Sequence, residues 1–169
     1  IVDVTEDIRE RRRIEQERDI DLLTGLYNRN RYIERLEAYK QVQDQQIGAI
    51  YIDLNGLKKV NDEQGHRAGD ELIVRAAGTI AGIFAEDAYR VGGDEFVVIL
   101  LDVSREEFAR KTEQLRRQMQ ENSVDASIGE VWQASTENLE DLLRRADENM
   151  YREKKRYYSQ ADAARKPES

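Results

Sequence analysis

Runs of apolar residues along this 169-residue chain predict four strands. IGAIYIDL (residues 47–54) is almost continuously apolar, which is typical of a strand buried on both faces. AYRV (88–91) and EFVVILLD (95–102) predict two strands joined by a Gly-Gly-Asp hairpin, and VDASIGEV (124–131) predicts a fourth. The chain therefore alternates between short buried runs and longer amphipathic stretches.

Apolar residues spaced three and four apart predict helices in those longer stretches. The helices are expected at about 32–42, at 68–84, after a capping box formed by Ser104 and Glu107, and at about 139–157. From residue 47 the order is strand, helix, strand, strand, helix, strand. This order predicts a ferredoxin-like α+β fold, a central antiparallel sheet backed by helices, with the helix at 139–157 as an addition.

The segments outside this pattern are polar. IVDVTEDI at the start alternates like the end of a strand, and RERRRIEQERD predicts a charged linker helix. Residues 55–70, rich in Gly, Asn and Asp, predict a polar loop, and the tail from Ser159 is expected to be frayed. We therefore divide the chain into an upstream segment (1–20), one main domain (21–158) and a tail (159–169).

Composition narrows the class of protein. The chain has 39% hydrophobic and 37% charged residues and no apolar stretch long enough to span a bilayer, as expected for a soluble protein. It has no cysteine, which excludes a disulfide framework and thiolate metal sites and fits a cytoplasmic location. A formal net charge of −8 argues against nucleic acid as a partner. Because it begins with Ile1 and carries no signal pattern, we expect a fragment of a longer protein.

Three carboxylates are expected to meet at one end of the sheet. The first and third strands of a ferredoxin-like sheet are its central neighbours, so Asp53 should lie beside Asp94 and Glu95 of the hairpin. Such a cluster, without histidine or thiolate, suits Mg²⁺. Gly92 and Gly93 would allow a sharp turn with positive φ and the approach of a phosphate. The alternative is an ordinary tight turn whose acidic pair binds nothing.

The segment after Asp53 favours a ligand site over a bare turn, because it concentrates cationic, amide and carboxylate side chains. They are Lys58, Asn61, Asp62, His66 and Asp70. Amide and carboxylate groups can recognise a purine edge, and a lysine can reach a phosphate. His66 is expected to be a structural hydrogen-bonding residue. The spacing fits neither an EF-hand nor a P-loop.

Five motifs occur in order between residues 19 and 158: DLLTGLYNR, DLNGLKKVNDEQGHRAGD, RVGGDEF, SIGE and RRADENMYREKK. Together they resemble the GGDEF family of diguanylate cyclases. The resemblance implies a fold like the nucleotidyl cyclase and polymerase palm. It also implies condensation of two GTP molecules into cyclic di-GMP with release of two pyrophosphates, in a homodimer whose protomers each bind one GTP.

The resemblance further implies a role for individual residues. The residues implied to bind Mg²⁺ or Mn²⁺ are Asp53, Leu54 (through its carbonyl), Asp94 and Glu95. Asp94 and Glu95 are also the implied catalytic residues, Asp94 as a proposed base. The residues implied to bind substrate are Asn61 and Asp70 at guanine, Lys58 and Lys154 at phosphate, and Gly92 and Gly93 in the hairpin.

The chain departs from the family pattern at three places. Tyr158 stands where a second phosphate-binding arginine is expected, so either Arg156 substitutes for it or triphosphate affinity is reduced. Asn55 stands at a position that is often Asp. An inhibitory site would need Arg and Asp where this chain has Ile83 and Glu86, so we expect no feedback inhibition through it.

The N-terminal segment resembles the end of a PAS sensor joined by a signalling helix, which implies an upstream sensor domain in the same chain. Two other functions compete with an active cyclase. One is a catalytically silent GGDEF domain that binds GTP and regulates a partner, which Tyr158 favours. The other is an interaction module whose acidic hairpin is only a turn, which the polar residues after Asp53 disfavour.

Overall fold

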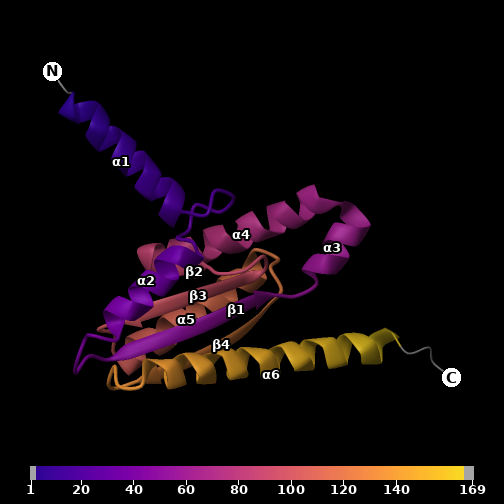
Figure 1. Cartoon of the computed structure of the whole chain (residues 1–169). Coiled ribbons are helices and arrows are strands. Elements are labelled where there is room, and N and C mark those ends of the chain that lie inside the picture. The colour runs from indigo at the N-terminus through magenta and orange to yellow at the C-terminus, as the bar shows by residue number, and fades with distance from the viewer. Residues whose placement is uncertain (1–2, 166–169) are drawn as a thin grey trace.

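A four-stranded antiparallel sheet forms the centre of the molecule (Figure 1). The computed structural model describes residues 3–165. The strands are β1 (Ile47–Leu54), β2 (Ala88–Arg90), β3 (Glu95–Leu101) and β4 (Ala126–Gln133). Their order in the sheet is β2-β3-β1-β4, with β1 and β3 adjacent at the centre. This arrangement confirms the ferredoxin-like prediction.

Helices cover both faces of the sheet. The helices are α1 (Val4–Asp19), α2 (Arg29–Tyr39), α3 (Leu57–Gln64), α4 (His66–Phe84), α5 (Arg105–Glu121) and α6 (Leu139–Arg165), with a short 3₁₀ turn at Ala85–Asp87. The buried residues of α4 and α5 pack in one apolar cluster, and those of α2 and α6 in another. The sheet lies between these two layers.

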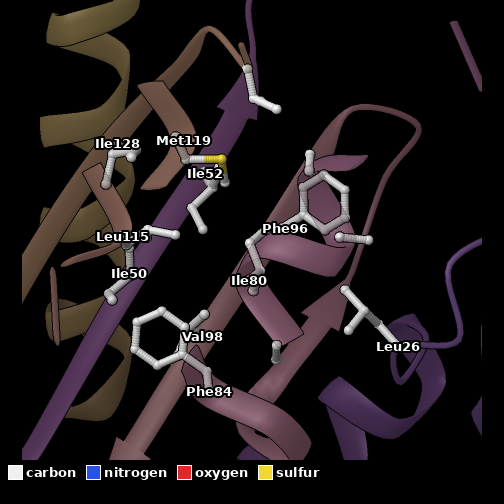
Figure 2. Packing of buried hydrophobic residues seen from close by; sticks show 14 of the residues in the cluster. Leu26, Ile50, Ile52, Ile80, Phe84, Phe96, Val98, Leu115, Met119 and Ile128 are labelled. Atoms are coloured by element: carbon white, nitrogen blue, oxygen red, sulfur yellow. The ribbon is translucent and has the colours of Figure 1, made fainter. Parts of the chain in front are cut away.

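The alternation of side chains along β1 explains its continuous apolar sequence. Ile50 and Ile52 pack in the cluster with α4 and α5, where Figure 2 shows them beside Phe96 of β3 and Leu115 of α5. Ile47 and Ala49 pack in the cluster with α2 and α6. Because successive residues of a strand point to opposite faces, Asp53 lies on the α2 and α6 side.

Two polar segments differ from their predictions. The expected polar loop at 55–70 was wrong, because α3 and the start of α4 are helical there. The helix α3 is eight residues long and has no fully buried residue, although Leu57 and Val60 pack against the apolar cluster. The expected strand end was wrong from Val4 onward, where α1 begins after Asp3 accepts a hydrogen bond from the Thr5 N–H, and residues 1–2 lie outside the described part. The structure continues α6 to Arg165, past Ser159 where fraying is expected.

The N-terminal helix α1 projects from the sheet and its helical layers (Figure 1), and its apolar residues Val4, Ile8 and Ile14 are exposed. Asn28 caps the C-terminal end of α1. The Asn28 side-chain amide donates to the Arg18 carbonyl (2.6 Å) and its backbone N–H donates to the Asp19 carbonyl (2.8 Å). Its side-chain oxygen also accepts from the Arg31 N–H, so one residue caps the end of α1 and the start of α2. Among the described residues, no helix combines the length and the apolarity needed to cross a membrane.

The helix α6 lies unusually close to β4 because of Gly129. A Cβ atom at this position would overlap the backbone of α6 at Ala146 and Met150. Arg116 of α5 also contacts this helix at its junction with β4. Its guanidinium donates to Glu153 of α6 (3.0 Å), to Glu130 of β4 (2.8 Å) and to the Ile128 carbonyl. These contacts set the position of Lys154, which follows Glu153.

We predict that Gly129→Ala lowers the free energy of unfolding by roughly 1–3 kcal/mol, because the new methyl group must push α6 away from the sheet. Chemical denaturation measures this change. Gly82→Ala is the matched control: it lies inside α4, and a Cβ there would meet no atom within 4 Å. The control should raise stability by about 0.5–1 kcal/mol. Equal effects of the two variants would contradict the close-packing argument.

Candidate active site

Three carboxylates meet at the end of the central strands, as the sequence predicts. Ligand oxygens of Asp53, Asp94 and Glu95 all lie within 4.8 Å of one another. Asp53 and Glu95 are directly opposite each other in the β1–β3 register. The Leu54 N–H donates to the Asp94 carbonyl (2.9 Å), which holds the hairpin against the end of β1. Like charges directly opposite in a sheet repel each other, so this arrangement favours a bound cation.

A lysine from α6 partly offsets this negative charge. Lys154 Nζ lies 2.9 Å from Asp53 Oδ1, and the Lys154 side chain is 20% exposed. Burial raises the pKa of Asp53 to about 6 and the Asp94 charge adds to the rise, against the lowering effect of Lys154. Lys154, implied by the resemblance to bind phosphate, therefore contacts a carboxylate of the cluster here.

The two hairpin glycines do not have the conformation that the sequence predicts. Neither Gly92 nor Gly93 has a positive φ, so the explanation by left-handed backbone was wrong. A Cβ at Gly92 would lie 3.0 Å from Glu95 Oε2 and press on that side chain. A Cβ at Gly93 would meet no atom within 4 Å, so the backbone there is open to a close-lying ligand. The hairpin therefore needs glycine for the space that a missing side chain leaves beside Glu95 and at Gly93. It does not need glycine for a positive φ.

Arg90 holds this hairpin to the N-terminal turn. Its guanidinium donates to the Gly93 carbonyl (2.9 Å) and to both carboxylate oxygens of Asp21 (3.1 and 3.2 Å). Asp21 also accepts from the Thr24 N–H and hydroxyl. Although burial raises the pKa of Asp21, these hydrogen bonds and the Arg90 charge outweigh it and lower that pKa.

Sequence patterns alone do not point to Asp21 or Arg90 as site residues. The one sequence signal for them is that each belongs to one of the five motifs, although the resemblance implies no catalytic or binding role for either. Their 69-residue separation means that only the folded structure pairs them.

Asn55 has a structural role at the end of β1. Its side chain donates to Asp125 Oδ1 (3.0 Å) and accepts from the Ser127 hydroxyl (2.9 Å), and its backbone N–H donates to the Asp125 carbonyl. The amide is 6% exposed and has hydrogen-bond partners at both its nitrogen and its oxygen. It therefore anchors the segment after Asp53 to β4.

The residues expected at guanine lie on α3 and α4. Asn61 of α3 packs against Gly69 of α4, where any Cβ atom would overlap the Asn61 amide. Asp70 follows Gly69 and is exposed, and Lys58 is exposed one turn before Asn61. The close approach at Gly69 thus brings Asn61 beside the turn of α4 that carries Asp70. Gly69 is a further candidate that the sequence patterns do not single out.

A cavity of about 380 Å³ lies between α3 and the last turns of α6. Its lining includes Gly56, Lys58, Lys59, Tyr157 and Tyr158. Arg156 lies elsewhere: it lines a cavity with Arg116 and Glu130, because two residues along a helix correspond to roughly 200° of rotation. This placement disfavours Arg156 as the substitute for the arginine that Tyr158 replaces.

Comparison with known proteins gives the family of this fold and site. The family model described as "Diguanylate cyclase, GGDEF domain" matches residues 18–160, which include every residue discussed above as a site candidate. The chain belongs to the GGDEF family. The acidic cluster and the helices around it are therefore those of a GGDEF domain, a family that uses a divalent metal.

Two relatives show the contexts in which similar sequences occur. Over 147 residues the chain is 33% identical to the diguanylate cyclase DgcS of Shewanella oneidensis, covering 79% of this chain and 49% of that protein. Over 106 residues it is 35% identical to the cyclic di-GMP phosphodiesterase PdeR of Escherichia coli, covering 61% of this chain and 16% of that protein. The chain spans less than half the length of these curated relatives.

A solved structure supports the fold. The coiled coil and GGDEF domain of DgcB from Caulobacter crescentus, in complex with c-di-GMP, aligns with a TM-score of 0.80 at 24% identity. The alignment covers 89% of this chain and 88% of that one. At this identity the likeness establishes the arrangement of the elements.

We predict that Asp94→Asn stabilises the metal-free GGDEF domain, because it removes one charge from the repelling cluster. In EDTA at pH 7 we expect a gain of about 0.5–1 kcal/mol, or roughly 1–4 °C in melting temperature. The gain should shrink at about pH 4.5, because the raised pKa of Asp53 leaves that carboxyl mostly protonated there. Thermal denaturation at the two pH values measures both effects.

The control for this variant is Glu113→Gln, which removes the same charge from an exposed position on α5. If the control matches Asp94→Asn, the gain comes from net charge and the local repulsion argument is wrong. Added Mg²⁺ should raise the melting temperature of the wild-type protein more than that of Asp94→Asn.

Proposed function

We propose that this GGDEF domain is an active diguanylate cyclase, which condenses two GTP molecules into cyclic di-GMP and releases two pyrophosphates. The observation that carries the proposal is the cluster of Asp53, Asp94 and Glu95 at the open hairpin of a GGDEF domain. The similarity to DgcS, a diguanylate cyclase, supports it.

The residues of the cluster fit Mg²⁺ or Mn²⁺. The donor set is made only of carboxylate oxygens, to which the Leu54 carbonyl is a proposed addition, and hard divalent cations prefer such ligands together with substrate phosphates. A metal ion bound there supplies Lewis-acid polarisation of the α-phosphoryl group and lowers the pKa of the attacking 3′-hydroxyl. Asp53, Asp94 and Glu95 hold it, and Asp94 and Glu95 are the proposed catalytic residues.

The protein's own residues orient the substrate in this proposal. The open backbone at Gly93 allows a phosphate to approach, while the lack of a side chain at Gly92 leaves room for Glu95. Lys58 and Lys154 neutralise phosphate charge. Asn61 and Asp70 select guanine, because a carboxylate accepts from the N–H groups of its Watson–Crick edge and an amide can donate and accept.

One protomer holds one GTP, so the proposed reaction needs a homodimer in which two sites face each other. We further propose that residues 1–20 connect the catalytic domain (21–158) to an upstream PAS-like sensor, and that the domain works in the cytoplasm. Feedback inhibition through the family's Arg-x-x-Asp site is absent in this proposal, because Ile83 and Glu86 occupy its positions.

A catalytically silent, GTP-binding domain is the second candidate. Two points favour it: Tyr158 stands where the family resemblance leads us to expect a phosphate-binding arginine, and the relative PdeR is a cyclic di-GMP phosphodiesterase. In this case the same cluster binds GTP with metal and regulates a partner domain without turnover.

We predict that the wild-type protein at high concentration, with GTP and Mg²⁺, forms cyclic di-GMP detectable by chromatography. Asp94→Ala should reduce the rate at least about 100-fold, because it removes a metal ligand. Glu113→Gln should retain wild-type activity and serves as the control. GTP binding that depends on Mg²⁺, without product in a demonstrated dimer, would contradict the cyclase and favour the silent domain.

We also predict that Gly69→Ala weakens binding of a non-hydrolysable GTP analogue roughly tenfold, because its methyl group displaces the Asn61 amide and one or two hydrogen bonds to guanine are lost. Calorimetric titration in Mg²⁺ measures the affinity. Gly78→Ala, on the same helix with no atom within 4 Å of a Cβ, should bind as the wild type does. An unchanged affinity of Gly69→Ala would refute the guanine role of Asn61.

A further inference from the structure

Lys154 is held from two sides. Its ammonium lies 2.9 Å from Asp53 Oδ1 and 5.7 Å from the centre of the Tyr158 ring. Tyr158 is four residues further along α6, so it lies on the same side of the helix one turn on. A lysine side chain has four rotatable bonds, and a ring that attracts its ammonium reduces the positions available to it.

Tyr158 is itself supported by the residues around it. Its ring meets the Tyr157 ring edge-on, with centres 5.1 Å apart and planes at 84°. The Tyr157 hydroxyl lies 3.5 Å from where a Cβ of Gly56 would be, so this pair reaches the segment that follows the end of β1 with Asp53. Tyr158 also lines the cavity with Lys58 and Lys59. The ring therefore contacts Lys154 and also lines the cavity between α3 and α6.

A second tyrosine–lysine pair on α6 provides a comparison. Lys155 Nζ lies 4.9 Å from the centre of the Tyr151 ring, again four residues apart, and Tyr151 is 55% exposed. The two pairs share their chemistry and spacing. Of the two pairs, only that of Lys154 and Tyr158 includes a residue that forms an ion pair with Asp53 of the acidic cluster. Lys155 is rotated by about 100° from Lys154 on the helix.

We propose that Tyr158 is a positioning residue: its ring keeps the Lys154 ammonium at the acidic cluster, where Lys154 binds the polyphosphate end of the nucleotide. This inference rests on the proposed binding of GTP by this site. A tyrosine adds no positive charge at neutral pH, so it acts through Lys154, while the attraction between ring and ammonium sets where that one cation lies.

The test is nucleotide affinity in Mg²⁺, measured by calorimetry for a non-hydrolysable GTP analogue and for GMP. Tyr158→Leu should weaken binding of the analogue roughly two- to fivefold, the range expected for an exposed cation–π contact, and leave GMP affinity unchanged. Tyr158→Phe keeps the ring and should match the wild type, as should Tyr151→Leu. In a Lys154→Met background, Tyr158→Leu should cause no further loss.

A second readout needs no nucleotide. The Lys154 side-chain protons should show ring-current shifts in NMR spectra of the wild type and of Tyr158→Phe, and these shifts should vanish in Tyr158→Leu. Unshifted Lys154 protons in the wild type would overturn the inference whatever the nucleotide result.

The remaining outcomes separate the inference from the proposed function. A wild-type protein that binds neither nucleotide overturns the proposed function, and the role of Tyr158 with it. If the wild type binds the analogue but Tyr158→Leu binds equally well, only the positioning role is overturned. An equal loss for the analogue and for GMP, or a loss in Tyr151→Leu of the same size, also overturns it, because either result indicates general damage to the helix.

Discussion

The repulsion between Asp53 and Glu95, directly opposite on the two central strands, is the constraint on which the rest of this site depends. Two carboxylates in one cross-strand pair, with Asp94 beside them, are unfavourable unless cations lie near. The sheet tolerates this because β1 and β3 are covered on both faces, with Ile50 in the cluster under α4 and α5 and Ala49 in the cluster under α2 and α6, which fixes the register. A slip by one residue would turn Asp53 into the apolar cluster under α4 and α5.

The position of α6 determines how this charge is offset. Gly129 allows the helix backbone to lie against β4, and Arg116 binds both Glu130 and Glu153 across the same junction. Lys154 follows Glu153 and thereby reaches Asp53. Because Gly129 has no side chain, α6 lies close against β4. This contact places the Lys154 ammonium 2.9 Å from the buried Asp53 carboxylate. Packing in the sheet and electrostatics in the site are consequently coupled.

Much of the fold follows from the sequence, because the apolar runs of the strands and the three- and four-residue apolar spacing of most helices are both clear. Continuous apolar runs mark strands that are covered on both faces, and the strand order places Asp53 beside the hairpin before any coordinates are known. The helix α3 could not be predicted this way, because none of its residues is fully buried and its polar residues resemble those of a loop. The hairpin glycines show a similar limit: glycine at a turn suggests positive φ, but here the requirement is space beside Glu95 and at Gly93.

No local sequence pattern predicts contacts between residues that are far apart in the sequence. In this domain several such contacts converge on the hairpin. Asn28 caps the end of α1, and the turn that precedes it carries Asp21, whose carboxylate holds Arg90. Arg90 in turn donates to the Gly93 carbonyl, next to Asp94. Asn28 and Arg90 each donate to a backbone carbonyl, and the planar Arg90 guanidinium also donates to the Asp21 carboxylate, so few side chains connect the N-terminal helix to the acidic cluster. The end of α1 and the hairpin next to Asp94 are therefore both held to the turn between α1 and α2, the first by Asn28 and the second by Arg90 and Asp21.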